Sequence, residues 1–336
     1  MTRFIFLVCL LLFVGAVYFL MDEKDHAKMS ELTAERAFSL EEINNLQKIV
    51  ITEKNKKSIV LNKNKDDSWQ LNAKYLARKN AVDNLIEVIE QVQIKYIPEQ
   101  AATKNIVNEM RTIGVQVDLY NDGDELLKSY QVGGATQDER GTYMMMNTKQ
   151  GLARPFVVNI PSIEGSVRGR FILSEIDWRD RAIIKEDVSK LNFIKVEYSG
   201  NAEESFIIKT NDGSLKVYDA IGNKEIDIDK NIVNAYIQGF DQVYAEYIDN
   251  SNPFRDSIAA LVPFTTISYG SSEKATKTIK LFPLSDLLYE NGGKVKMTTM
   301  EVGGRYFIDC SWGDFMLAQN RLIGKLLRGK SFFELK

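Results

Sequence analysis

The eighteen residues from Phe4 to Met21 contain no charged side chain, and this run constrains the chain more than any other feature. As a helix that rises about 1.5 Å per residue, it would span roughly 27 Å, just enough to cross the hydrocarbon core of a bilayer. Arg3 precedes the run, and Asp22 and Glu23 follow it. Because the cationic end of such a segment stays in the cytoplasm, we predict a single-pass inner-membrane anchor through residues 4–21, with the soluble part on the periplasmic side.

A cleaved signal peptide is the alternative interpretation of this segment. The apolar part of a signal peptide is about 7–15 residues long and ends in small residues at the cleavage site. Here the run ends in Tyr18-Phe19-Leu20-Met21, which is a poor cleavage site. We therefore favour an uncleaved anchor (residues 1–21), followed by a polar tether (residues 22–45).

The composition is that of a globular protein long enough for two domains. Of its 336 residues, 44% are hydrophobic and 26% are charged, which excludes a disordered chain. A net charge of −3, with acids and bases interspersed, predicts no nucleic-acid partner. The only histidine is His26 and the only cysteines are Cys9 and Cys310, so no disulfide framework or zinc site is expected. We expect Cys310 to be a small buried residue at the end of a strand.

Short strands followed by an amphipathic helix make up the first half of the folded region. The strand patterns end in Ser68-Trp69-Gln70-Leu71, and Val82, Leu85 and Ile89 then recur on one face of a helix. Asn121-Asp122-Gly123-Asp124 predicts a β-hairpin between further strands. A helical stretch over residues 162–173 is expected to close the unit.

The second half repeats this order. Strands are predicted at 193–198 and 205–209, Asp229 opens a helix, and a last helix is expected over residues 313–327. Three pairs of landmarks keep similar spacings: Phe193 minus Ile49 is 144, Tyr306 minus Phe156 is 150, and Arg328 minus Arg179 is 149. Such spacing predicts a duplicated unit; chance similarity of short strand patterns is the alternative.

Six short segments follow one another over about 140 positions of the first half: Ser68-Trp69-Gln70-Leu71, the helix at 82–94, Ile113-Gly114-Val115, Tyr130-Gln131-Val132-Gly133, Thr142-Tyr143-Met144 and Trp178-Arg179-Asp180-Arg181. Their succession resembles a large bacterial family known only as domain of unknown function 4340. The chain departs from the family at Thr112-Ile113-Gly114, where the family usually has Tyr-Gly-Leu, and at Asn80, where an acidic residue usually opens the helix. The resemblance implies a companion of ABC-type exporters, including those linked to gliding motility, and brings no catalytic residues with it.

No catalytic motif stands out in the sequence. His26 cannot form a nucleophile–base pair within the folded region, and Gly133-Gly134 and Gly303-Gly304 lack the lysine of a phosphate-binding loop. Met144-Met145-Met146 could suggest a soft metal, but strand alternation favours core packing for one or two of them. Pairs of carboxylates suited to glycan hydrolysis have no fixed spacing that would identify them.

Two pairs of cations are the candidate partner contacts. Arg179 with Arg181, and Arg328 with Lys330, each follow a predicted helix at the end of a unit. Cations at helix C-termini are also stabilised by the helix dipole, so capping is the simpler explanation. The functional explanation is a basic surface that contacts a membrane partner.

We therefore predict an α+β protein with two tandem, similar units, residues 46–187 and 188–336, after the transmembrane helix. Each unit is expected to be a mainly antiparallel sheet with helices on one face. The predicted function is that of a non-enzymatic accessory or scaffolding protein, without a cofactor, whose partner is an inner-membrane protein such as an ABC permease or its auxiliary subunit. A carboxylate-dependent cell-wall hydrolase and an envelope ligand-binding module are the alternatives.

Overall fold

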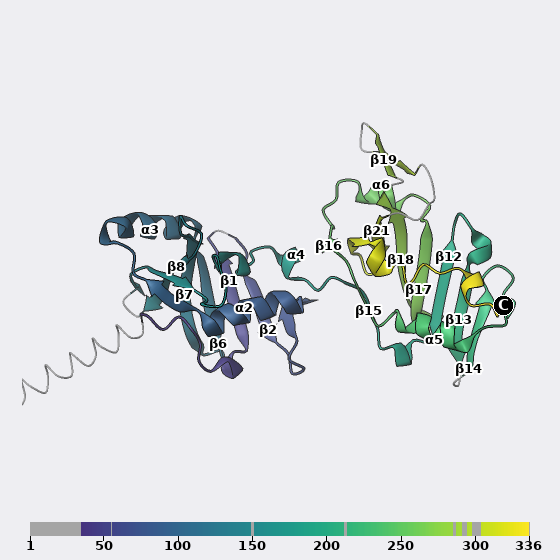
Figure 1. Cartoon of the computed structure of the whole chain (residues 1–336), viewed down its shortest axis with the longest axis horizontal. Helices are drawn as coiled ribbons and strands as arrows, with labels where there is room; N and C mark the ends of the chain where they lie inside the picture. The colour runs from purple at the N-terminus through teal and green to yellow at the C-terminus, as the bar shows by residue number, and fades with distance from the viewer. Residues whose placement is uncertain are drawn as a thin grey trace, which may run out of the picture. The chain divides into compact units, whose positions relative to one another are not determined.

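The computed structural model describes residues 35–335, except for 55, 149–150, 212–213, 285–286, 291–293 and 298–303. Both the anchor predicted at residues 4–21 and His26 lie outside the described residues. In the part of the chain that is described, no helix has the length and apolar character needed to span a membrane. The fold is α+β, with mainly antiparallel sheets and few helices (Figure 1).

The chain divides into two compact units between Asp180 and Arg181. The sequence placed this division between residues 187 and 188. The difference arises because β11 (Ala182–Lys185) pairs antiparallel with β15 (Gln242–Tyr244), which ties the residues after Arg181 to the second unit.

The first unit is built on one antiparallel sheet with the strand order β4-β3-β2-β1-β6-β7-β8-β10-β5, and β9 pairs with β8. Its strands are β1 (Lys48–Glu53), β2 (Ile59–Lys63), β3 (Trp69–Leu71), β4 (Tyr75–Leu76), β5 (Gln93–Tyr96), β6 (Val115–Tyr120), β7 (Leu126–Ala135), β8 (Thr142–Thr148), β9 (Gly151–Leu152) and β10 (Phe156–Asn159). Its helices are η1 (Ile43–Asn45), α2 (Lys79–Gln91), α3 (Gln100–Ile113), η2 (Arg168–Arg170) and α4 (Glu175–Trp178).

Helix α2 covers the apolar face of this sheet. Val82, Leu85 and Ile89 are buried on it, as their helical spacing predicts. Alternate strand residues point to the same face, so the register aligns a buried row across four strands. That row is Leu71, Leu61, Ile49 and Leu119.

Helix α3 lies on the opposite face, which corrects the prediction that the helices share one face. Its Ile106 and Met110 form a separate buried cluster with Met145, whereas Met144 and Met146 belong to the main core. Consecutive strand residues point to opposite faces, and α3 covers the second one, so all three methionines are buried rather than one or two. The helix approaches β7 closely at Gly133, where a Cβ would lie 2.7 Å from Cγ of Met110.

The folded part of the first unit begins before residue 46, and this corrects the end of the predicted tether. Phe38 and Leu40 are buried. The ring of Phe38 packs edge-on against those of Tyr130 and Phe156, with centroids 6.4 and 5.8 Å apart. Phe38 and Leu40 therefore belong to the core, so the folded part of the first unit begins inside the range predicted as a tether.

The second unit has an eight-stranded antiparallel sheet of order β14-β13-β12-β17-β18-β21-β22-β16. The strands are β12 (Phe193–Tyr198), β13 (Phe206–Asn211), β14 (Ser214–Asp219), β16 (Tyr247–Ile248), β17 (Thr265–Ser272), β18 (Ala275–Pro283), β21 (Arg305–Cys310) and β22 (Phe315–Gln319), with a separate ribbon of β19 (Leu287–Glu290) and β20 (Lys294–Met297). The helices are η3 (Val188–Lys190), η4 (Ala202–Glu204), α5 (Lys230–Gln238), α6 (Arg255–Ala259), α7 (Asn320–Ile323) and η6 (Lys330–Phe332).

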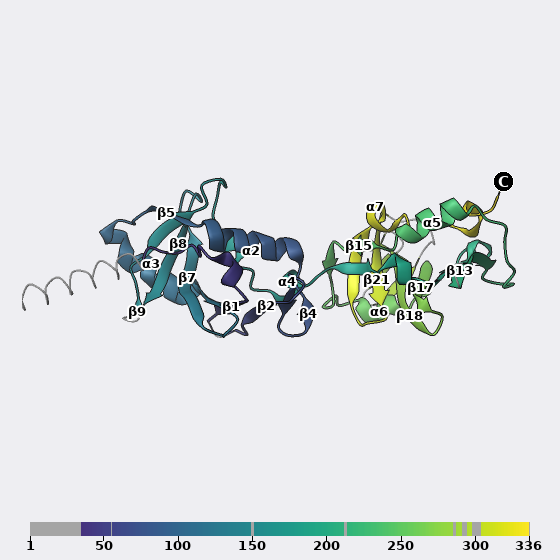
Figure 2. The same cartoon turned by 90° about the horizontal axis from the view of Figure 1, so that it is seen from below.

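Helices again lie on two faces of the sheet. Asp229 caps α5 by accepting a hydrogen bond from the Asn231 backbone N–H at 2.8 Å, as the sequence predicts. In Figure 2, α5 runs along the second sheet much as α2 runs along the first. On the other face, Ile258 of α6 joins a cluster with Phe282 and Phe307.

Two predicted helices are wrong. Residues 162–173 contain only the short turn η2, and residues 313–327 contain strand β22 followed by the single turn α7. The four residues Phe315 to Ala318 are all buried, because β22 is covered on both faces. Such a run does not alternate between apolar and polar residues, so the sequence gives no sign of a strand there. Cys310 is buried at the end of β21, as predicted.

Candidate functional site

The first predicted cation pair makes local structural contacts. The Arg179 guanidinium carbon lies 3.9 Å from the centroid of the Tyr75 ring, and Arg179 forms a β-bridge with Ala77. Arg181, which belongs to the second unit, donates a hydrogen bond from Nη1 to the backbone oxygen of Glu246. Both side chains thus contribute to the fold within their own units.

The second pair lies on a C-terminal segment, residues 326–331, that side chains of the second unit hold in place. The Tyr236 hydroxyl donates to the backbone oxygen of Leu326 at 2.9 Å, and the Tyr198 hydroxyl donates to that of Arg328 at 2.8 Å. The Glu204 carboxylate accepts hydrogen bonds from the backbone N–H and the hydroxyl of Ser331, at 3.0 and 2.9 Å. The backbone that carries Arg328 and Lys330 is therefore fixed at three points.

A cavity of about 350 Å³ opens beside this segment. It is lined by Tyr198, Gly200, Asn201, Glu204, Phe264, Leu327 and Gly329. The segment and η4 meet closely at its edge, because a Cβ on Gly329 would lie 2.9 Å from the carboxylate carbon of Glu204. Aromatic walls with one amide and one carboxylate suit the binding of a side chain or small ligand.

The tyrosine in this cavity is a hydrogen-bond donor. A tyrosine is protonated at neutral pH, and burial raises the pKa of Tyr198 further above its usual value because it disfavours the phenolate. Its hydroxyl donates to the backbone oxygen of Arg328. Burial raises the pKa of Tyr236 in the same way.

The side chains of Arg328 and Lys330 point to different neighbours. The Arg328 guanidinium carbon lies 5.0 Å from the centroid of the exposed Phe332 ring. Lys330 contributes to lowering the pKa of Asp219, whose main cause is the hydrogen bond from the Ile221 backbone N–H. Sequence reasoning missed Tyr198 and Glu204, which lie more than a hundred positions from the segment they hold.

The residues just before α2 and α5 make similar backbone hydrogen bonds. The N–H of Arg78, which precedes α2, donates to the backbone oxygen of Trp178 at 2.7 Å. The N–H of Asp229, which precedes α5, donates to that of Phe333 at 3.1 Å. The next residues, Arg179 and Glu334, form β-bridges with Ala77 and Ile228. Relative to these two helices, Glu334 rather than Arg328 occupies the place that Arg179 occupies in the first unit.

A polar network lies on the face of the first sheet opposite its main core. Ser129 donates to the Asp118 carboxylate at 2.7 Å, Gln116 donates to both, and Asn147 donates to Ser129 at 2.7 Å. These four side chains come from β6, β7 and β8. Each of these side chains already has a hydrogen bond within the network. The network can still present amide and hydroxyl groups to another protein.

Within the described ranges, no group of three or more histidine, cysteine, aspartate or glutamate side chains is arranged to hold a metal ion. The chain matches no family model, no curated protein and no solved structure.

Proposed function

We propose that this chain is a membrane-anchored, extracytoplasmic scaffolding protein whose soluble part consists of two tandem copies of one α+β unit. The strand orders support duplication. From β3 to β5 the first sheet runs β3-β2-β1-β6-β7-β8-β10-β5, and the second runs β14-β13-β12-β17-β18-β21-β22-β16. If β5 is matched with β16, each strand has a counterpart at the same place in the order.

The observation that carries the proposal is the repetition of individual hydrogen bonds. The Gln47 N–H donates to the backbone oxygen of Tyr120 at 2.9 Å, and the Asn192 N–H donates to that of Gly270 at 3.1 Å. The offsets are 192 − 47 = 145 and 270 − 120 = 150. The buried row Leu71, Leu61, Ile49 and Leu119 has the counterpart Val217, Ile208, Ile194 and Tyr269. Agreement of register residue by residue goes beyond a shared strand order.

Binding is the function that this arrangement favours, because the cores correspond while the outer faces differ. The first unit presents the network of Gln116, Asp118, Ser129 and Asn147. The second presents ion pairs, among them Lys195 with Glu197 at 2.7 Å and Lys209 with Glu273 at 3.3 Å. Two copies with different surfaces can hold two different regions of a partner at once.

The membrane part of the proposal rests on residues 4–21. An anchored periplasmic domain suits a partner in the same membrane, such as an ABC permease or its auxiliary subunit. The resemblance to domain of unknown function 4340 points to the same setting. Mass spectrometry of the mature protein is expected to find residues 1–21 intact; a mature N-terminus near Asp22 would contradict the anchor.

Co-purification tests the binding role. Full-length protein with a C-terminal tag, extracted from membranes in mild detergent, is expected to retain an integral membrane protein at constant ratio. Recovery of the chain alone after cross-linking would contradict the scaffold role, and hydrolysis of cell-wall glycans by the purified protein would favour the hydrolase instead.

The cations allow a sharper version of this test. Arg328→Ser with Lys330→Ser should weaken the co-purification and leave the melting temperature unchanged, since Arg328 is exposed and Lys330 is half-exposed. Lys104→Ser with Lys274→Ser, at exposed positions elsewhere, is the matched control. Arg179→Ser with Arg181→Ser should lower the melting temperature, because those side chains contact Tyr75 and Glu246. Equal binding by the first pair and its control would remove Arg328 and Lys330 from the interface.

A further inference from the structure

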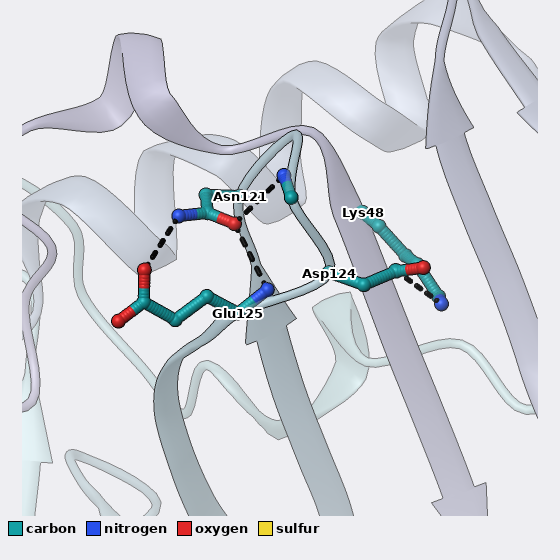
Figure 3. A network of polar contacts seen from close by, with 5 residues as sticks. Lys48, Asn121, Asp124 and Glu125 are labelled. Carbon is teal, nitrogen blue, oxygen red and sulfur yellow. Dashed lines mark hydrogen bonds and ion pairs between the residues drawn. The ribbon is translucent and has the colours of Figure 1, made fainter.

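The turn between β6 and β7 is organised by the side chain of Asn121. Its Oδ1 accepts hydrogen bonds from the backbone N–H groups of Gly123 and Glu125, at 3.0 and 2.9 Å, and its Nδ2 donates to the Glu125 carboxylate at 3.1 Å (Figure 3). Asp124 adopts a positive φ of 56° and pairs with Lys48 at 2.8 Å. This is an Asx turn, in which the side chain mimics a backbone acceptor.

The turn contains an Asp-Gly bond that is chemically reactive in flexible chains. The backbone nitrogen of Gly123 can attack the Asp122 side-chain carbonyl carbon. A C–N bond then forms, the nitrogen loses its proton, and water leaves to give a succinimide. Hydrolysis adds the water back and opens the ring to aspartate or isoaspartate, so no reactant other than water is needed. Glycine favours the attack because it has no side chain to shield the nitrogen, and Asp122 is exposed.

We propose that Asp122 is a latent isomerisation site and that the Asn121 side chain keeps it unmodified. The Gly123 N–H is directed at Asn121 Oδ1, and the same oxygen holds the Glu125 N–H. To reach the Asp122 side chain, the Gly123 nitrogen must rotate out of the first bond and strain the second. Closure of the succinimide ring thus requires opening of the turn.

The consequence of modification would be local and large. Isoaspartate moves one side-chain carbon into the backbone, which lengthens the turn by one atom. Strand β6 pairs with both β1 and β7, so the altered turn ends one of the central strands of the first sheet. The Lys48–Asp124 ion pair would be displaced with it.

Three variants of the full-length protein in detergent separate this role from general hairpin stability. Asn121→Ala removes the acceptor, Asn121→Asp combined with Glu125→Gln retains the acceptor oxygen and a hydrogen bond to residue 125, and Lys48→Met removes the ion pair without touching Gly123. Each is incubated at neutral pH and 37 °C, and isoaspartate at residue 122 is measured by peptide mapping, with the urea-unfolded chain as reference. Hydrogen exchange of the Gly123 amide reports whether its bond is lost.

Asn121→Ala is expected to isomerise roughly tenfold faster than the unaltered protein. This factor corresponds to the net contribution of one amide hydrogen bond to stability. Lys48→Met, and Asn121→Asp combined with Glu125→Gln, should stay near the unaltered rate. Equal rates in the folded and unfolded chains would overturn the proposal. So would equal acceleration by Asn121→Ala and Lys48→Met, which would assign the protection to the hairpin as a whole.

Discussion

Phe333 is expected to be the side chain that fixes the C-terminal segment to the core of the second unit. It is fully buried, and its ring lies 4.8 Å from that of Phe206 and 5.1 Å from that of Tyr236, measured between centroids. Its backbone oxygen accepts the N–H that precedes α5. Phe333→Ala would leave a cavity between β13 and α5, and such truncations cost about 3–5 kcal/mol of unfolding free energy.

The neighbouring residue provides a matched control for the same change. Phe332 is 45% exposed, and its ring is in contact with the Arg328 guanidinium. Phe332→Ala removes the same number of atoms one position away, without opening a core cavity. Its expected cost is about 0.5 kcal/mol, which is typical of a surface substitution.

Hydrogen exchange followed by mass spectrometry resolves the two units within the intact chain. Since each 1.4 kcal/mol is about a factor of ten, a cost of about 3–5 kcal/mol means that Phe333→Ala should speed exchange in β13 and α5 by roughly 10²- to 4 × 10³-fold. Peptides from β1 and β2 should not change, because they belong to the other unit. If Phe333→Ala and Phe332→Ala had the same effect, the C-terminal segment would not be part of the cooperative core. Faster exchange in β1 and β2 would show that the units unfold together.

Gly270 has no room for a side chain, and the buried tyrosines make the stability of the fold depend on pH. Gly270→Ala should prevent the β17–β18 pairing from forming normally, because its Cβ would overlap the Ala275 backbone and lie 2.9 Å from that residue's carbonyl carbon; a circular dichroism melt unchanged from that of the unaltered protein would contradict this. Burial raises the pKa values of Tyr130 and Tyr236, so the folded state holds the phenolic protons more tightly than the unfolded one. Their stabilisation is complete below the unfolded pKa of about 10 and falls above it by about 1.4 kcal/mol per pH unit for each group. Urea unfolding between pH 8 and 11 should show this decline, with a shallower slope in Tyr236→Phe; equal slopes would refute the assignment.

The sequence predicts elements well where one face of a strand or helix is solvated. Alternation identified β3, helical spacing identified α2, and Asn-Asp-Gly located the turn between β6 and β7. In each case a single period separates apolar from polar positions, and local hydrogen bonds reinforce it. Asp229 is a similar case, because an N-cap is a local interaction.

Prediction fails where burial does not follow one face. Helix α3 was not predicted, since Ile106 and Met110 are its only buried residues and give too weak a stripe. Strand β22 was assigned to a helix because its four consecutive buried residues contain no alternation. The cavity could not be predicted from the sequence for a different reason. Tyr198 donates a hydrogen bond to Arg328 across 130 positions, and no local pattern encodes such a contact.

If the two units are copies, as we propose, charged residues are poor landmarks for aligning them. Repeated backbone hydrogen bonds require only a carbonyl and an N–H, so the residue that supplies them is free to change: Trp178 would correspond to Phe333, and Arg78 to Asp229. Buried positions must stay apolar but need not stay identical, as Leu119 and Tyr269 would illustrate. A sequence comparison based on charged landmarks therefore follows the positions that are least constrained. If the units are copies, their shared chemistry lies in backbone and core, and what each binds is decided by the outer side chains in which they differ.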